Sequence, residues 1–143
     1  MAARQVINMG LFISDAETAA ATCQDYDLVI DCIDHEYTAP NKVVIVPTGK
    51  TNHSWTIADL NKIIAAALPV MRAGGKVLIH CRRGVSRSAV GAAAILLGCG
   101  RSQSVKMALI KTGGDTDPNP QSVKGLTDWL KLRESKAQPS LFV

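Results

Sequence analysis

One continuous stretch, residues 77–97, constrains the fold of this chain more than any other. It begins with the apolar run Val77-Leu78-Ile79 and passes through His80-Cys81-Arg82-Arg83-Gly84-Val85-Ser86-Arg87-Ser88 into a run of small and apolar residues. This order predicts a buried strand, a loop and the N-terminus of a helix. Because unpaired backbone N–H groups and the helix dipole converge at such a junction, we expect it to bind an anion, and phosphate in particular.

The rest of the chain alternates between short apolar runs and segments with helical spacing. The predicted further strands cover residues 6–13, as one strand or a strand pair, 28–33 and 42–47. The predicted further helices cover residues 14–23, 56–72 and 117–133, and another starts at Ser102 or Ser104 and ends at the Gly113-Gly114 break. This alternation implies an α/β fold with a central, mostly parallel, twisted sheet flanked by helices. The ligand site of such a sheet lies beyond the carboxyl ends of its strands, so the loops at 34–40, 48–55 and 81–87 should face one crevice.

Length and composition indicate one domain over residues 1–143, with 135–143 as a loosely held tail. The chain has 143 residues, 47% of them hydrophobic, which suffices for one core and not for two. No apolar run is long enough to span a membrane and no secretory signal is evident, so we expect a cytoplasmic protein in a reducing environment. The formal net charge of +4 favours anionic partners without establishing nucleic-acid binding.

The four cysteines lack the spacing of a zinc site or of a redox Cys-x-x-Cys motif. Cys23, Cys32 and Cys99 are interpreted as small core residues. Cys81 is different, because it stands between a predicted strand and the loop that leads into the predicted helix. A thiolate at that place is suited to attack a phosphate monoester, and the helix N-terminus and nearby guanidinium groups should lower its pKa.

The residues around Cys81 supply the other parts of such chemistry. Arg87 can hold two phosphate oxygens with its planar guanidinium group. Ser88 can donate a hydrogen bond to the sulfur and improve it as a leaving group, and His80 is expected to be a buried residue that shapes the loop. Gly84 allows the backbone to turn its N–H groups inward. The segment predicted to bind phosphate consists of Arg82, Arg83, Gly84, Val85, Ser86 and Arg87.

These residues resemble the Cys-x5-Arg-Ser/Thr signature of the protein tyrosine phosphatases, and the nonamer from His80 to Ser88 is similar to that of the dual-specificity branch. Val46-Pro47 is similar to the Ile-Pro at which a strand of that branch ends, and Asp117-Pro118-Asn119 to its Ser-Pro-Asn helix start, which makes Asn119 a supporting residue. The resemblance implies a three-layer phosphatase domain, a phosphocysteine intermediate at Cys81, and neither metal nor cofactor.

The sequence departs from this family at the general acid. The family has an Asp in the loop after the Ile-Pro strand, and the corresponding position here is Lys50, which we interpret as a possible anion-binding residue. His53 is the candidate acid within the same loop, because it titrates near neutral pH. Asp59 is a second candidate, although its place three residues after Thr56 is typical of a helix cap.

The leading functional hypothesis is a phosphatase acting on phosphotyrosine, and on phosphoserine or phosphothreonine, in proteins. Two alternatives within the same chemistry are an RNA 5′-triphosphatase, for which RNA would be the partner, and a phosphoinositide phosphatase. RNA is not favoured, because Ser86-Arg87-Ser88 differs from the Asn-Arg-Thr-Gly ending of those enzymes. A phosphate-binding pseudophosphatase is the non-enzymatic alternative, but a pure binder has no use for the thiolate of Cys81.

Overall fold

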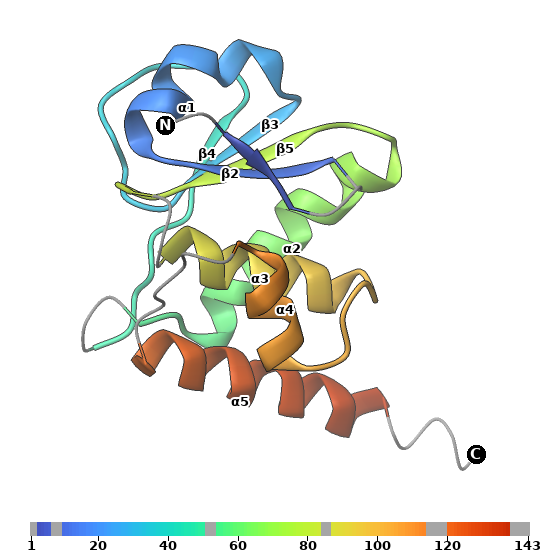
Figure 1. The fold of residues 1–143 in the computed structure, drawn as a ribbon. Helices are drawn as coiled ribbons and strands as arrows, with labels where there is room; N and C mark the ends of the chain where they lie inside the picture. The colour runs from blue at the N-terminus through green and yellow to red at the C-terminus, as the bar shows by residue number, and fades with distance from the viewer. Residues whose placement is uncertain (1–2, 7–9, 51–53, 84–86, 114–119, 138–143) are drawn as a thin grey trace.

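The computed structural model describes residues 3–6, 10–50, 54–83, 87–113 and 120–137. Its centre is a five-stranded sheet with the strand order β1-β2-β5-β3-β4 (Figure 1). The strands are β1 (Arg4–Gln5), β2 (Leu11–Ser14), β3 (Leu28–Asp31), β4 (Lys42–Val44) and β5 (Val77–His80). Only β1 runs antiparallel to its neighbour among these strands, so the expectation of a mostly parallel sheet is confirmed.

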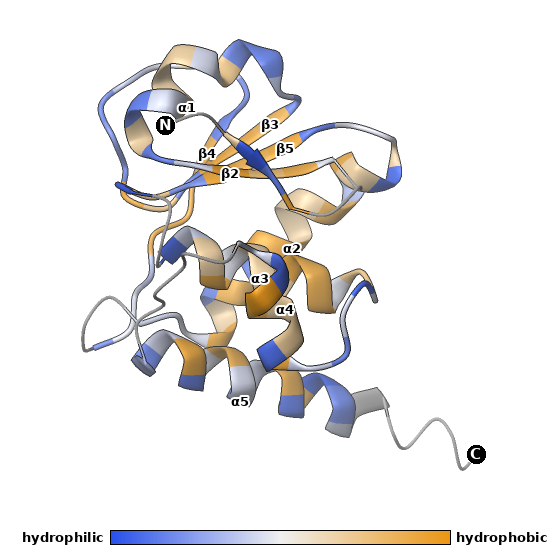
Figure 2. Cartoon of the chain, viewed as in Figure 1, coloured by the Kyte–Doolittle hydropathy of each residue, from blue (hydrophilic) through white to orange (hydrophobic). Residues whose placement is uncertain are grey.

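Helices cover both faces of the sheet and complete three layers. One face carries α1 (Ala16–Thr22), which continues into a short 3-10 turn, η1 (Cys23–Asp25). The other face carries the remaining helices (Figure 1). They are α2 (Ile57–Arg72), α3 (Arg87–Gly98), α4 (Val105–Lys111) and α5 (Pro120–Ala137). Figure 2 shows the central strands and α3 largely in the hydrophobic colours, whereas α5 alternates along its length, as a helix on the surface does.

The helix α3 is the centre of the larger core, and every residue from Ser88 to Leu97 is buried. Gly91 makes this close packing possible. A Cβ atom at that position would lie 2.6 Å from Cδ1 of Ile79 on β5 and 3.2 Å from Cδ1 of Ile63 on α2. Because β5 and α3 are pressed together in this way, the loop that joins them has both of its ends fixed.

Several boundaries differ from those predicted. The opening run predicted at 6–13 corresponds to a strand pair with other bounds, because β1 ends at Gln5 and β2 begins only at Leu11. The N-cap of α1 is Asp15, whose carboxylate accepts a hydrogen bond from the Thr18 N–H at 2.8 Å, since Ser14 is the last residue of β2. The last helix continues to Ala137, past the predicted start of the tail at residue 135.

Of the three cysteines interpreted as core residues, only Cys32 is buried, while Cys23 and Cys99 are half-buried. Cys23 and Cys99 directly follow the last residues of α1 and α3, and both pack against the buried core clusters. Within the described residues, no helix combines the length and the apolar character that a membrane span needs.

Candidate active site

The sulfur of Cys81 lies at the first turn of α3. Cys81 directly follows β5 and is only 4% exposed. Its Sγ atom is 3.2 Å from the hydroxyl oxygen of Ser88, the second residue of α3. The N-terminal end of a helix favours negative charge, and the sulfur of Cys81 meets α3 at that end. The structure therefore brings together Cys81 and Ser88, the predicted nucleophile and its predicted hydrogen-bond partner.

His80 is joined by hydrogen bonds to the backbone of Cys81 and to the side chain of Tyr37. Its Nδ1 atom is 3.3 Å from the carbonyl oxygen of Cys81, which can only accept, so Nδ1 carries the proton. Nε2 then accepts from the hydroxyl of Tyr37 at 2.8 Å. Burial lowers the pKa of His80, and the nearby carboxylate of Asp31 opposes this effect only in part. His80 is thus a neutral residue that positions the backbone of Cys81.

A buried ion pair fixes the loop that follows β3. The Nζ atom of Lys42 is 3.4 Å from a carboxylate oxygen of Asp31, and it donates hydrogen bonds of 2.8 Å to the carbonyl oxygens of His35 and Tyr37. The same ammonium group lies 4.2 Å from the ring centre of Tyr37. Burial, followed by the charge of Asp31, raises the pKa of Tyr37 well above its usual value, so Tyr37 remains a protonated donor.

Trp55 connects the loop before α2 to the start of α3. The side chain is 2% exposed, and its indole N–H donates to the carbonyl oxygen of Arg87 at 3.2 Å. Trp55 is therefore both a buried apolar side chain and a hydrogen-bond donor to the backbone of Arg87. This carbonyl belongs to the first residue of α3, so Trp55 helps to set where that helix begins.

The structure describes Lys50, the predicted anion-binding residue, and Asp59, the second candidate acid, and places them in contrasting environments. Lys50 is exposed to solvent. Asp59 is 2% exposed and forms a complete capping box with Thr56. Its carboxylate also accepts from the Thr48 N–H at 2.8 Å and from the Thr48 hydroxyl at 2.9 Å. Burial alone would raise the pKa of Asp59, but the hydrogen bonds from Thr48 and Thr56 outweigh it and lower the pKa. An ionised, fully bonded carboxylate is poorly suited to donate a proton.

A cavity of about 480 Å³ opens beside Arg82 and Arg83, the first two residues of the segment predicted to bind phosphate. It is lined by Asp15, Ala16, Glu17, His35, Arg82 and Arg83. The loops after β3 and β5 therefore share a crevice as predicted. None of the described residues of the third predicted loop, 48–55, lines this cavity, and its third wall comes from the start of α1. The N–H of Ala16 donates to the carbonyl oxygen of Arg82 at 3.0 Å and holds this wall against the loop. Ligand sites lie beyond the carboxyl ends of parallel strands, and β2 is one of these strands. The same rule would therefore have identified the residues after Ser14 as part of the crevice.

Other predicted site residues lie outside the described residues, namely His53, Gly84, Val85, Ser86 and Asn119. The described residues also contain a feature that the sequence gave little reason to expect, the chain from Lys42 through Asp31 and Tyr37 to His80. Its only signal was a carboxylate at the end of an otherwise apolar strand. Among the described residues, no group of His, Cys, Asp and Glu side chains is arranged to hold a metal ion.

No protein-family model matches the sequence, and no curated protein matches it. Solved structures do match. A single-residue variant of human DUSP28 is 22% identical, with 95% of this chain and 99% of that chain covered and a TM-score of 0.79. PTPMT1 is 18% identical, with 96% and 99% covered and a TM-score of 0.80. A mouse putative dual specificity phosphatase complexed with zinc tungstate is 23% identical, with 94% and 89% covered and a TM-score of 0.76. The chain has the fold of the dual-specificity phosphatases.

Proposed function

We propose that the chain is a cysteine-dependent phosphatase of the protein tyrosine phosphatase superfamily, with Cys81 as its nucleophile. The observation that carries this proposal is the 3.2 Å contact between the sulfur of Cys81 and the hydroxyl of Ser88 at the start of α3. It brings a thiol, a helix N-terminus and a hydroxyl that can donate to the leaving sulfur together at one point. A structural cysteine needs none of these, and a phosphate-binding protein needs only the backbone N–H groups and Arg87.

The reaction has two steps. In the first, the thiolate of Cys81 forms a bond to phosphorus while the bond from phosphorus to the ester oxygen breaks, and that oxygen leaves with a proton. Arg87 binds the oxygens of the transferred group, over which the charge spreads. In the second step water attacks the phosphocysteine, inorganic phosphate is released and Cys81 leaves as a thiolate. The Ser88 hydroxyl then stabilises the sulfur as negative charge returns to it.

The first substrate class is phosphotyrosine in proteins, together with phosphoserine and phosphothreonine. Because a free thiolate requires reducing conditions, we place this activity in the cytoplasm. His53 is our candidate for the group that protonates the leaving oxygen. The hydrogen bonds that keep Asp59 ionised make that carboxylate the weaker choice.

The nucleophile is tested by hydrolysis of p-nitrophenyl phosphate and by trapping. Cys81→Ser should lose at least about 10³-fold in kcat, because an alcohol is a far poorer nucleophile at neutral pH. Rapid acid quenching of the wild type should yield one phosphoryl group on the peptide that contains Cys81. Cys99→Ser is the matched control and should keep full activity. Equal turnover by the wild type and Cys81→Ser would disprove the proposal.

The proton donor is tested by comparing two leaving groups. Tyrosine leaves with a high pKa and needs a proton, whereas nitrophenol leaves readily without one. His53→Ala should therefore lose roughly 10²-fold on a phosphotyrosine peptide and much less on p-nitrophenyl phosphate. Asp59→Asn should not show this selective loss. Equal losses by His53→Ala on the two substrates would remove His53 from the role.

The cavity beside the loop favours a phosphoinositide as the second candidate substrate. Its lining contains Arg82, Arg83 and His35 beside Asp15 and Glu17 and, among the described residues, no Phe, Tyr or Trp side chain that would stack on a tyrosine. PTPMT1, which shares the fold, has been crystallised in complex with PI(5)P. If this substrate is correct, PI(5)P should be hydrolysed with a higher kcat/KM than a phosphotyrosine peptide, and Arg83→Ala should raise the KM for PI(5)P alone. A higher kcat/KM for the peptide would decide for the protein substrate.

A further inference from the structure

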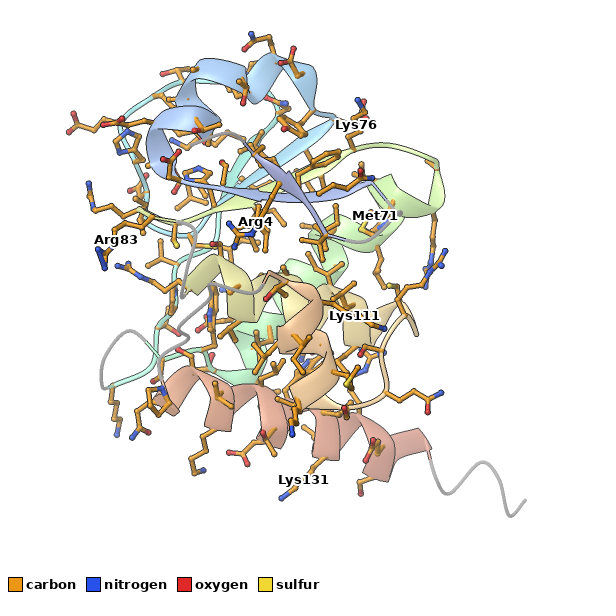
Figure 3. All side chains as sticks on the ribbon, in the orientation of Figure 1. Arg4, Met71, Lys76, Arg83, Lys111 and Lys131 are labelled. Atoms are coloured by element: carbon orange, nitrogen blue, oxygen red, sulfur yellow. The ribbon has the colours of Figure 1, made fainter. Side chains whose placement is uncertain are left out.

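A second surface lies at the opposite end of α3 from the candidate active site. Two adjoining hollows, of about 310 and 300 Å³, meet at Arg101, which lines both of them. One is formed by the last turns of α2 and α3, and the other by the segment 100–104 together with α4. The helix α3 has 12 residues, so its two ends are about 18 Å apart. Figure 3 shows Met71 and Lys111 on one side of the molecule and Arg83 on the other.

This surface, which we call the α4 groove, is basic. The sequence has no Asp or Glu between Asp59 and Asp115, although it has nine Lys and Arg residues in that interval. Arg72, Arg101 and Lys111 line the groove, and none of its described lining residues is acidic. Lys111 donates one hydrogen bond of 2.7 Å to the carbonyl oxygen of Arg101, which leaves two of its three protons for a ligand. No ion pair between described residues involves Arg72 or Arg101.

The groove also offers apolar surface. Met107 is 48% exposed and Ile110 is 56% exposed, and they lie one turn apart on α4. Leu68 and Met71 line the adjoining hollow. Each hollow is at the lower limit of ordinary ligand pockets, about 300–1,000 Å³, and is therefore suited to a single apolar side chain rather than to a whole cofactor. Two exposed apolar residues beside a hollow are also too few for stable insertion into a membrane.

We propose that the α4 groove binds an acidic peptide segment of a partner protein, with an apolar side chain of that peptide in a hollow and its carboxylates against Arg72, Arg101 and Lys111. The basic residues attract the carboxylates of such a segment, and the small apolar depression fixes which of its side chains is bound there. Binding there leaves the phosphate-binding loop open, so the partner can be held while the active site works. The proposal does not depend on the chemistry of Cys81.

The test uses the full chain and a displayed library of random twelve-residue peptides. Selection should enrich peptides in which Asp or Glu flank Leu, Met or Phe. Synthetic, fluorescein-labelled copies of these peptides are then measured by fluorescence anisotropy. Arg101→Glu should weaken their binding at least about tenfold, and added salt should weaken binding to the wild type. Met107→Ala should weaken it several-fold without changing the salt dependence.

Two controls separate the groove from general effects. Lys131→Glu makes the same charge change on the exposed face of α5 and should leave binding within twofold of the wild type. Arg101→Glu should keep the wild-type rate on p-nitrophenyl phosphate, which shows that it is folded. The proposal is overturned if the enriched peptides lack acidic residues, or if Arg101→Glu binds them as well as the wild type does. Displacement of the peptides by inorganic phosphate, or binding only to phosphatidylserine vesicles, would also overturn it.

Discussion

Gly125 on α5 provides a sensitive test of how the outer helix positions the active site. A Cβ atom at this position would overlap the carbonyl oxygen of Trp55, which is a backbone atom and cannot turn aside. In an isolated helix, Gly125→Ala would stabilise by about 0.5–1 kcal/mol, because alanine loses less conformational entropy than glycine. Overpacking of a fitted contact costs about 1–3 kcal/mol. We therefore expect net destabilisation of roughly 1–2 kcal/mol.

The expected change can be measured by urea unfolding and by thermal melting. The free energy of unfolding should fall by about that amount, and Tm by roughly 3–8 °C for a chain of this size. Because Trp55 also donates to the carbonyl oxygen of Arg87, its displacement should lower kcat/KM for p-nitrophenyl phosphate by roughly three- to thirtyfold. Lys131→Ala, on the exposed face of the same helix, should change neither quantity measurably. A Gly125→Ala variant more stable than the wild type would refute the close contact between α5 and Trp55.

Three further predictions concern single side chains. Trp55→Phe keeps the ring but removes the donor to the carbonyl oxygen of Arg87, so urea unfolding should show a loss of about 0.5–1.5 kcal/mol, and kcat should fall. Asp59→Asn should lower the free energy of unfolding by about 1–2 kcal/mol at pH 7. Hydrogen bonds lower the pKa of Asp59, so this difference from the wild type is present above pH ~4 and should disappear as the pH falls through the lowered pKa. Burial lowers the pKa of His80, so the unfolded chain binds a proton at this residue more readily than the folded chain does. The stability of the fold should therefore fall as the pH decreases below ~6.5. Urea midpoints between pH 5 and pH 7 will measure how steeply stability depends on pH.

Each of these predictions can fail in its own way. Trp55→Phe with unchanged stability would mean that the indole N–H contributes nothing at α3. A difference between Asp59→Asn and the wild type that persists at pH 2 would contradict the charge-based explanation. For His80, the comparison is His80→Asn, which cannot titrate and should lack the component of the slope that His80 contributes. Identical slopes in the two proteins would show that His80 is not the titrating group.

Local sequence patterns were enough to predict the parts of the site that are close together in the chain. The strand before Cys81, the helix after it and the contact of Cys81 with Ser88 follow from spacing alone, because β5 and α3 are joined directly. The cap formed by Thr56 and Asp59 is equally local and is present as predicted. Within such segments, periodicity and capping chemistry determine the structure.

The predictions were less accurate where the partners are distant in the chain. The bond from Tyr37 to His80 joins residues 43 positions apart, and the bond from Trp55 to Arg87 joins residues 32 apart. No local sequence pattern around these residues predicts the two hydrogen bonds. They depend on the order β2-β5-β3 in the sheet and on the packing of α3 against the sheet. The same applies to the wall that α1 contributes to the cavity beside the loop.

The sequence by itself determined the α/β class, and it was enough to predict Cys81 as the candidate nucleophile and the strand-to-helix junction around it, since these depend on neighbouring residues. Only the tertiary structure decided what surrounds Cys81. Folding buries His80 as a neutral support, commits the carboxylate of Asp59 to capping, and places Arg101 and Lys111 in a separate basic groove. Burial and charge environment are properties of the assembled fold, because the desolvation of a side chain is set by whatever packs against it.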